Sequence, residues 1–451
     1  MRNMQDIKNI YFVGIGGIGM SALARFFKHL GYAVAGYDAR KTELTVQLES
    51  EGISIVYDDK VSDFHKKLDK DNTLVVLTPA IKESNILSYF QENGFEISKR
   101  AEVLGRLVNN YPLIAIAGTH GKTTTSAITA HILKEAGKLL AGFVGGIVKN
   151  YNSNLILGDN KEGYIVVEAD EYDRSFLSLH PDIAVITTID ADHLDIYGDY
   201  NCIKSAFEEF VSGTKQGAKV ILNEDINLNT SGKTVYKYGL SAKSDFYVSE
   251  VKHEQGKQSV KYCLGSDTVS ADLHMPGKAN LLNSLAAAGV AYSTGIDTLT
   301  IGKAISSFAG VKRRFDIVWQ KGNQVIIEDY AHHPREIEAL LQAAKEFYPG
   351  KEITVVFQPH LFSRTRDFAD DFAKVLSRFD KVIITDIYPA REKPIEGIDG
   401  QMLASKSGDK AVYVPKDKLA GYLLDEPFDV LLLVGAGDID MIVDNLKKGL
   451  Q

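Results

Sequence analysis

Short apolar runs alternate with longer segments in which apolar residues recur every three or four positions, and this pattern continues through most of the chain. Continuous apolar runs rich in β-branched residues are typical of strands covered on both faces of a parallel sheet. The longer periodic segments predict the covering helices. We therefore expect an α/β fold with mainly parallel, doubly wound sheets. The predicted strands are 11–13, 33–37, 74–77, 113–117, 165–167, 183–187, 325–328, 353–357, 382–385 and 430–434.

The chain has 451 residues, more than one hydrophobic core usually serves, which predicts two to three domains. A polar break at Asn109, Asn110 and Pro112 separates two strand–helix series. A second boundary is expected at the end of the stretch GVKRRFD, near Asp316. The predicted domains are 1–108, 109–315 and 316–451, and the central one carries a small antiparallel appendage within 236–273.

A first glycine-rich loop lies in the stretch FVGIGGIGMSALARFFKHLGYAVAGYD (12–38), where Gly14, Gly16 and Gly19 follow an apolar strand. Such spacing lets backbone N–H groups approach a pyrophosphate at a helix N-terminus. Asp38 ends the next strand, where an acid accepts a ribose hydroxyl. Taken alone, this loop is typical of a nicotinamide-dependent dehydrogenase.

A second loop, AGTHGKTTT (117–125), also joins an apolar strand to a helical pattern. Here the helix dipole and successive N–H groups favour a phosphate, Lys122 can reach the terminal phosphates of ATP, and Thr123 can bind Mg²⁺. The loop is shorter than the common GxxxxGK[ST] pattern, because Ile116 stands five positions before Gly121. The alternative is a tight turn with a solvated Lys122. A dehydrogenase leaves this loop unexplained, whereas a non-catalytic P-loop regulator remains a second possible class.

Acidic residues follow the next two predicted strands. The stretch YIVVEADEYDRSF places Glu168 at a strand end, and we expect it to bind a metal, because carboxylates at the carboxyl ends of parallel strands face the ligand crevice. Taken singly, Asp170, Glu171 and Asp173 are each expected to belong to a solvated loop. The stretch TTIDADHLDIYG places Asp190, Asp192, His193 and Asp195 at the same edge of the sheet. For His193 we favour a metal or substrate role over structural hydrogen bonding.

Composition narrows the class of partner. The net charge is −8 with no basic block, which argues against nucleic acid and polybasic membrane binding and favours small metabolites. Two cysteines without CxxC spacing indicate neither a disulfide framework nor a thiolate zinc site. No apolar stretch approaches the roughly 18 residues of a membrane-spanning helix. We therefore expect a cytoplasmic protein without membrane insertion.

Nine motifs occur in the order shown by the Mur ligases of peptidoglycan synthesis, and the chain resembles that family over essentially its whole length. The resemblance is greatest to members that join L-alanine to UDP-N-acetylmuramate. It implies an N-terminal UDP-sugar domain, a central ATPase domain, and a C-terminal domain that completes the nucleotide and amino-acid sites. The motifs are GTHGKTTT, EADEYDRSF, DADHLDIYG, GKANLLNSLAA, GVKRRFD, DYAHHPREI, FQPHLFSRTRDF, DIYPAREKPIEGI and VGAGDID.

The implied reaction is an ATP-dependent ligation of L-alanine to the lactyl carboxylate of UDP-N-acetylmuramate through an acyl phosphate. The implied metal is Mg²⁺ at two sites, with Mn²⁺ able to substitute. A monomer or weak homodimer is expected. The alternative is a related ligase that adds a recycled murein tripeptide to the same sugar.

The resemblance also implies residue roles. ATP contacts come from Gly118, Thr119, His120, Gly121, Lys122, Thr123, Thr124, Asn283, Arg314 and Asp329. UDP-sugar contacts come from Gly14, Gly16, Gly17, Gly19, Asp38 and Thr78. Metal ligands are Thr123, Glu168 and His193, and the amino-acid and carboxylate contacts are Tyr330, His332, His360 and Arg364. The catalytic residues are Lys122, His193, Arg314, His332 and Arg364.

Some assignments stay open or depart from the family. The base that deprotonates the amine is His193, His332 or Asp192. Scaffold hydrogen bonding is the alternative role for His333 and Arg366. Ala279 and Leu361 stand where the family often has His and Arg, and the stretch LTPAI (77–81) replaces a Ser-rich sugar-binding loop.

Overall fold

The computed structural model describes residues 4–190, 200–254, 257–390 and 392–450. Its contacts divide the chain into two compact units, which are described separately. The first unit comprises Met1–Glu250, Lys261–Ala271 and Leu282–Ala309, and the second comprises Val251–Val260, Asp272–Leu281 and Gly310–Gln451. In the described part of the chain, the strands form three sheets.

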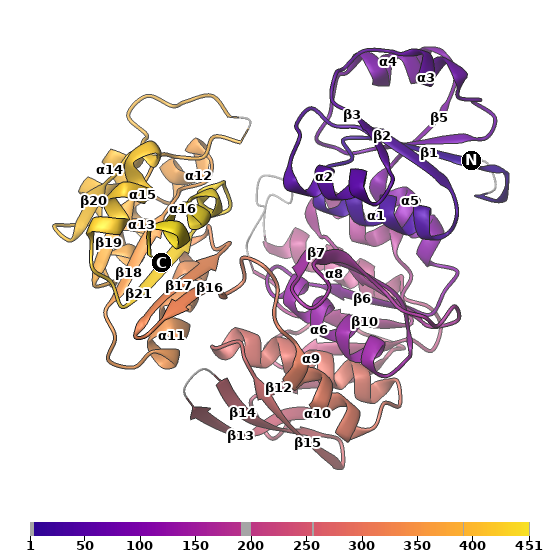
Figure 1. Ribbon diagram of the computed structural model, residues 1–451. Coiled ribbons are helices and arrows are strands. Elements are labelled where there is room, and N and C mark those ends of the chain that lie inside the picture. The colour runs from indigo at the N-terminus through magenta and orange to yellow at the C-terminus, as the bar shows by residue number, and fades with distance from the viewer. Residues whose placement is uncertain (1–3, 191–199, 255–256, 391, 451) are drawn as a thin grey trace. The chain divides into compact units, whose positions relative to one another are not determined.

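The first sheet has five parallel strands in the order β3-β2-β1-β4-β5 (Figure 1). Both of its faces are buried, because Phe12 and Tyr11, neighbours on β1, belong to two different hydrophobic cores. Its strands are β1 (Asn9–Val13), β2 (Ala33–Tyr37), β3 (Ser54–Val56), β4 (Thr73–Leu77) and β5 (Glu96–Lys99). The helices of this part are η1 (Met4–Asp6), α1 (Ile18–His29), α2 (Glu43–Ser50), α3 (Asp63–Lys67), α4 (Asn85–Glu92) and α5 (Arg100–Val108).

The second sheet has ten strands in the order β15-β14-β13-β12-β11-β10-β6-β9-β7-β8. Its first strands are β6 (Leu113–Ala117), β7 (Leu139–Val148), β8 (Ser153–Leu157), β9 (Tyr164–Glu168) and β10 (Ile183–Ile186). They are followed by β11 (Lys219–Asn223), β12 (Thr234–Gly239), β13 (Phe246–Glu254), β14 (Lys257–Leu264) and β15 (Asp267–Leu273). The accompanying helices are α6 (Lys122–Glu135), η2 (Tyr172–Ser178), α8 (Tyr200–Ser212), α9 (Lys278–Ser293) and α10 (Thr298–Ser307).

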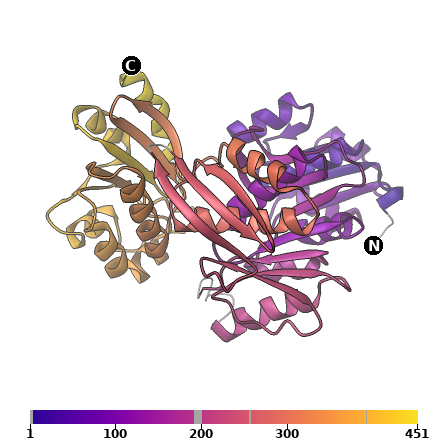
Figure 2. The same cartoon turned by 90° about the horizontal axis from the view of Figure 1, so that it is seen from below.

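The third sheet lies in the second unit and has the order β16-β17-β21-β18-β19-β20, in which only β16 and β17 pair antiparallel. Its strands are β16 (Asp316–Lys321), β17 (Gln324–Asp329), β18 (Ile353–Phe357), β19 (Lys381–Ile384), β20 (Ala411–Tyr413) and β21 (Val430–Val434). One face packs on α11 (Pro334–Phe347), α13 (Ala369–Leu376) and α14 (Gly400–Lys406), and the other on α15 (Lys416–Asp425), η3 (Ile439–Ile442) and α16 (Val443–Gly449). The short helix α12 (Phe362–Asp367) follows β18. Residues 316–450, which form the third sheet and its helices, are coloured orange to yellow in Figures 1 and 2.

The predicted α/β class with mainly parallel sheets is confirmed. All ten predicted strands exist, and 33–37, 113–117, 353–357 and 430–434 have the predicted ends. The segment 236–273 differs in its connection, because β12 pairs in parallel with both β11 and β13 and so continues the main sheet. Within the described residues, no helix is both long and apolar enough to span a membrane.

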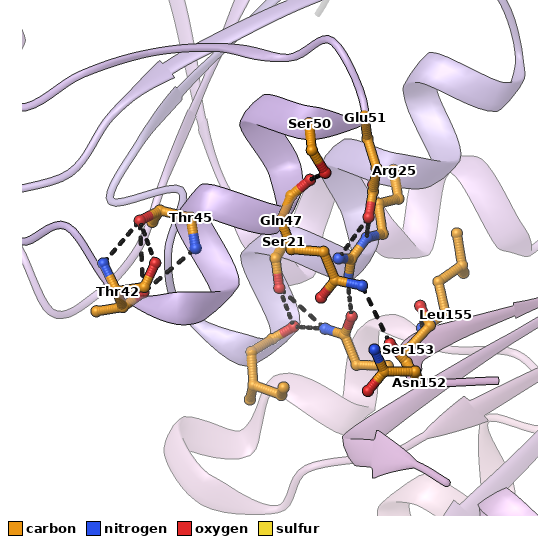
Figure 3. Close-up of polar contacts among 12 residues, drawn as sticks. Ser21, Arg25, Thr42, Thr45, Gln47, Ser50, Glu51, Asn152, Ser153 and Leu155 are labelled. Atoms are coloured by element: carbon orange, nitrogen blue, oxygen red, sulfur yellow. Dashed lines mark hydrogen bonds and ion pairs between the residues drawn. The ribbon is translucent and has the colours of Figure 1, made fainter. Parts of the chain in front are cut away.

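A buried polar network joins helix α1 to strand β8 inside the first unit (Figure 3). Arg25, whose side chain is 7% exposed, makes a bidentate contact with Glu51 at 2.8 Å and donates to Asn154. Asn154 is fully buried and donates in turn to Ser21 at 2.9 Å and to the carbonyl of Ile18. Since α1 begins at the first glycine-rich loop, the network fixes that loop relative to the second sheet.

We expect Arg25→Met to lower the free energy of unfolding of the first unit by about 2 kcal/mol, because the substitution keeps the apolar stem but leaves Glu51 and Asn154 without their donor. Urea unfolding followed by circular dichroism measures this loss. Arg40→Met is the control, since Arg40 is exposed and outside the network. Equal stability of both variants would contradict the role of the network.

Candidate active site

The second glycine-rich loop joins β6 to α6 and leaves a row of N–H groups for an anion. Gly118 and Gly121 have φ values of +139° and +84°, and a Cβ at either position would collide, with Thr187 and with Asn283 respectively. The N–H groups of 121–124 have no acceptor within the described ranges. The first turn of a helix with unsatisfied N–H groups is an anion site.

Lys122 is held against its own loop by a buried acid. Its ammonium donates to the carbonyl of Gly118 at 2.6 Å and pairs with Glu171 at 2.6 Å. Glu171 is only 3% exposed, and burial raises the pKa of its carboxyl, while Lys122 opposes that rise. The alternative of a solvated Lys122 is therefore wrong, and the expectation that Glu171 belongs to a solvated loop is wrong too.

Glu168 lies at the carboxyl end of β9 with both oxygens fixed. It accepts a hydrogen bond from the hydroxyl of Thr123 at 2.8 Å and another from the N–H of Gly145 at 2.6 Å. Two cis ligands of octahedral Mg²⁺ lie about 2.9 Å apart, so this pair of hard oxygen donors fits that ion. The two predicted metal ligands of the described chain are thus brought together.

The loop after β10 closes the same edge of the sheet. The N–H of Asp190 donates to the hydroxyl of Thr119 at 2.9 Å, and the Asp190 carboxylate lies 3.4 Å from Nε2 of His120. The N–H groups of Thr119 and His120 bond to Thr188, at 3.0 and 2.8 Å. The predicted residues Asp192, His193 and Asp195 lie outside the described residues. In the described ranges, no three His, Cys, Asp or Glu side chains form a metal-binding group.

Asn283, near the start of α9, lies directly beside the phosphate loop. Its side-chain oxygen accepts a hydrogen bond from the hydroxyl of Thr125 at 3.2 Å, and it occupies the space that a Cβ on Gly121 would need. The structure therefore brings this predicted nucleotide contact to the loop from a segment more than 150 residues away in the chain.

The first glycine-rich loop joins β1 to α1. Gly14 has a φ of +87°, and a Cβ there would collide with Thr78. Asp38 accepts a hydrogen bond from the N–H of Gly16 at 2.7 Å. Gly17 caps α1 without a side-chain acceptor, which leaves the helix end open to an anion. The predicted UDP-sugar residues thus lie together.

Arg100, the first residue of α5, was not among the predicted site residues. Its Nη1 atom lies 3.0 Å from the position of a Cβ built on Gly19, and it lines a small cavity together with Glu168 and Asp170. Arg100 therefore lies between the first glycine-rich loop and the acidic edge of the second sheet. A cation in the first turn of a helix opposes the helix dipole, and this is the one unusual feature that the sequence shows at Arg100.

In the second unit, the predicted residues Arg314, Asp329 and Tyr330 lie on two segments, 313–315 and 329–330, that hydrogen bonds join. Asp329 accepts from the N–H of Phe315 at 2.7 Å, and the N–H of Tyr330 donates to the carbonyl of Arg313 at 2.8 Å. Arg313 and Phe315 have φ values of +60° and +47°, in the left-handed region that residues other than glycine rarely adopt. The two hydrogen bonds hold the backbone in this conformation. The guanidinium of Arg314, between them, lies 5.2 Å from the centre of the Tyr330 ring.

His332 follows the same strand and is held as a neutral base. Its Nδ1 lies 2.9 Å from the carbonyl of Tyr330, which can only accept, so the proton is on Nδ1 and Nε2 carries the lone pair. Burial lowers the pKa of His332, Glu336 raises it, and the charges of Arg364 and Arg314 lower it further. The imidazole is therefore neutral at pH 7.

His360 lies beside His332, with 6.1 Å between the ring centres. Its ring stacks on Tyr388 at 5.6 Å, and its Nδ1 is buried without a partner in the described structure. Burial, the charge that His332 carries when it is protonated, and the charge of Arg364 together lower the pKa of His360 to about 4. Leu361 adopts a φ of +72° at the start of α12, which carries Arg364.

His333 and Arg366 have contacts that fit scaffold roles. His333 caps α11, accepting from the N–H of Arg335 at 3.4 Å, and its ring packs on Phe368 at 4.9 Å. Arg366 is exposed and pairs with Asp367 at 2.7 Å.

Comparison with known proteins gives the family. Three family models match in chain order: "Mur ligase family, catalytic domain" (9–112), "Mur ligase middle domain" (116–291) and "Mur ligase, glutamate ligase domain" (313–437). The chain belongs to the Mur ligase family. A curated Mur ligase of Flavobacterium psychrophilum, UDP-N-acetylmuramate--L-alanine ligase, is 47% identical over 453 residues, with 100% of this chain and 99% of the relative covered.

Two solved Mur ligase structures are also similar. UDP-N-acetylmuramate-alanine ligase from Thermotoga maritima has a TM-score of 0.83 at 30% identity, covering 98% of this chain and 99% of that one. A murein peptide ligase from Psychrobacter arcticus has a TM-score of 0.70 at 22% identity, with 98% of each chain covered, and shares the fold.

Mur ligases are ATP-dependent, and nucleotide phosphates bound at this loop would compete with Glu171 for the ammonium of Lys122. We expect Glu171→Gln to tighten ATP binding about fivefold, because one charge-assisted contact no longer has to be broken. Isothermal titration calorimetry measures the dissociation constant. Glu162→Gln, at an exposed turn, is the control. Weaker ATP binding by Glu171→Gln would show that Glu171 contacts the bound nucleotide instead.

Proposed function

We propose that this Mur ligase joins L-alanine to the lactyl carboxylate of UDP-N-acetylmuramate, with conversion of ATP to ADP and phosphate. The observation that carries the proposal is the full-length similarity to relatives named for this reaction, at 40–47% identity. The pairing of an open phosphate loop with Thr123 and Glu168 supports it, because a phosphoryl-transfer site needs both. Addition of a recycled tripeptide has less support, since the murein peptide ligase structure is only 22% identical.

We assign one substrate to each glycine-rich loop. The loop at 118–124, with Asn283, binds the ATP phosphates, and Arg314 and Asp329 complete the nucleotide contacts. The loop at 14–19, with Asp38 and Thr78, binds the diphosphate of the UDP-sugar, because N–H groups at a helix end bind any diphosphate. Arg100 adds a positive charge on the path from that loop to Glu168.

Thr123 and Glu168 would hold Mg²⁺, and His193 would contact a second ion, with Mn²⁺ able to replace either. The bound metal supplies charge that neutralises the phosphoryl oxygens. The three proposed domains are 1–108, 109–315 and 316–451. We also propose that the protein works in the cytoplasm as a monomer or weak homodimer.

The reaction has two steps. A carboxylate oxygen of the sugar acid bonds to the γ-phosphorus while the bond to ADP breaks, which gives an acyl phosphate. The amine of L-alanine then bonds to the carbonyl carbon, and phosphate leaves with the former carboxylate oxygen. In the first step the sugar carboxylate must approach the γ-phosphate, and both are anions. Two like unit charges 4 Å apart repel by about 4 kcal/mol at an effective dielectric of 20. Lys122 and Arg314 offset this repulsion.

The amine must lose a proton before or during its attack, and we assign that proton to Nε2 of His332. The neutral imidazole with Nδ1–H bound to Tyr330 supports this choice among the three candidates. His360 and Arg364, on the neighbouring segment, are proposed to bind the carboxylate of L-alanine.

Phosphate release tests the proposed reaction. With ATP, Mg²⁺ and UDP-N-acetylmuramate present, we expect L-alanine to support release and the murein tripeptide not to. An ¹⁸O label in the sugar carboxylate should appear in the phosphate.

Lys122→Ala should abolish release of phosphate, while binding of the UDP-sugar is kept. Loss of both would contradict the division between the two loops, and unlabelled phosphate would exclude the acyl phosphate.

The pH profile tests the base. Activity requires neutral His332, so kcat/KM should fall as the pH drops through a pKa below the ordinary value of 6.5. The carboxylate of Glu336 favours the protonated ring, so Glu336→Gln should move this acid limb to lower pH by about 0.5 to 1. Glu338→Gln, on the same helix and paired with Arg378, should leave the limb in place. An unmoved limb in Glu336→Gln would assign the base to another group.

A further inference from the structure

Residues 144–147 of β7 bulge out of the second sheet. Phe143 of β7 pairs with Leu155 of β8. The next pair joins Val148 to Ser153, so four residues of β7 lie opposite a single residue of β8. A bulge leaves its extra residues out of the regular ladder, and bulges are common next to active sites, where they change the direction of backbone and side-chain groups.

The bulge directs one backbone N–H at Glu168. Strands β7 and β9 pair in parallel as far as Phe143 and Val167, one residue before Glu168 at the end of β9. Two residues further along β7, the N–H of Gly145 donates to Oε2 of Glu168 at 2.6 Å. The other carboxylate oxygen, Oε1, accepts from the hydroxyl of Thr123 at 2.8 Å. Two different elements, β7 and α6, therefore hold the two oxygens of Glu168 in one orientation.

Residue 145 has no room for a side chain while Glu168 keeps this orientation. A Cβ built on Gly145 would lie 2.5 and 2.6 Å from the two carboxylate oxygens of Glu168 and 2.8 Å from its carboxyl carbon. Non-bonded atoms pack at about 3.5–4.0 Å. Gly145 is exposed and its φ lies outside the left-handed region, so neither the core nor the backbone conformation demands glycine here. The position of the carboxylate accounts for the glycine.

A ligand of Mg²⁺ needs such positioning, because this ion demands near-ideal octahedral geometry with oxygens at about 2.0–2.1 Å. Groups that hydrogen-bond a metal ligand fix its orientation, and their loss commonly weakens metal binding about 10- to 100-fold. The hydrogen bond from Gly145 holds Oε2 on the β7 side of the carboxylate, which keeps Oε1 beside the hydroxyl of Thr123.

We propose that Gly145 is a positioning residue for Glu168, both through its N–H and through its lack of a side chain. The inference rests on the proposed role of Thr123 and Glu168 as Mg²⁺ ligands. A methyl group at residue 145 turns the carboxylate away from Thr123 and lowers the affinity for the metal. The fold is kept, because the group that must move is the end of a flexible side chain.

Titration of the full chain with Mn²⁺ alone tests the proposal, since the electron paramagnetic resonance signal of free Mn²⁺ reports how much is bound. We expect Gly145→Ala to weaken Mn²⁺ binding about tenfold or more. Binding of ATP in the presence of a metal chelator should be unchanged, because the N–H groups of the phosphate loop are not altered. In the phosphate-release assay, the Mg²⁺ concentration that gives half the maximal rate should rise by a similar factor, and saturating Mg²⁺ should restore kcat.

Two further variants separate this inference from the proposed function. Gly213→Ala adds the same methyl group at another exposed position of the first unit, where its nearest neighbours would lie 3.5 Å away, and it should bind Mn²⁺ normally. Glu168→Gln should bind Mn²⁺ at least about tenfold more weakly, because the ligand charge is lost. If the unsubstituted chain did not bind Mn²⁺, or Glu168→Gln bound it equally well, the proposed metal site would be wrong and the inference would fall with it. If Glu168→Gln lost Mn²⁺ but Gly145→Ala did not, the metal site would stand and the positioning role would be overturned.

Two other results would give the glycine a different reason. If Gly145→Ala weakened binding of UDP-N-acetylmuramate and left Mn²⁺ binding unchanged, the open space at residue 145 would serve the approach of the sugar. A parallel loss of Mn²⁺ binding, ATP binding and melting temperature would show damage to the fold. Either result would overturn the proposal.

Discussion

The parallel pairing of β6 with β9 on one side and β10 on the other is the constraint on which the phosphate site depends. The register places Ile116 opposite Glu168 and Ala117 opposite Ile186, so all three strands end at one level. Whatever follows each strand must then meet at the same point. The second glycine-rich loop, Glu168 and the threonines after β10 meet for this reason, and hydrogen bonds only refine their positions.

Burial sets the charge states that the chemistry needs. Lys122 stays beside its loop because a buried carboxylate faces it, so its ammonium is held at the site proposed for the nucleotide phosphates. In the second unit burial has the opposite use, because it keeps His332 and His360 neutral near two arginines. In the proposed reaction, the first unit thus provides a positive charge for phosphate and the second provides a proton acceptor for the amine.

The local apolar pattern of the sequence was sufficient to predict the central strands of the sheets. Runs such as 113–117 and 430–434 are apolar at every position, because helices cover both faces of the sheet. The apolar pattern alone was therefore enough to predict where these strands begin and end. Edge strands such as β3 and β20 are short and partly exposed, so they carry no such run and were missed. The antiparallel strand β8 was missed for another reason, since its fully buried Asn154 interrupts the apolar pattern and is explained only by Arg25 and Ser21 on a distant helix.

For the site, the sequence by itself determined the two glycine-rich loops, the acid after β9 and the family, because each depends on residues close together in the chain or on motifs in order. Only the tertiary structure decided that Glu171 restrains Lys122, that Arg100 lies between the first glycine-rich loop and Glu168, and which nitrogen of His332 carries the proton. These facts depend on burial and on contacts between distant segments. The sequence gives the identity of each side chain. The electric field at an ionisable group depends instead on the charged and polar groups that the fold places within a few ångströms of it.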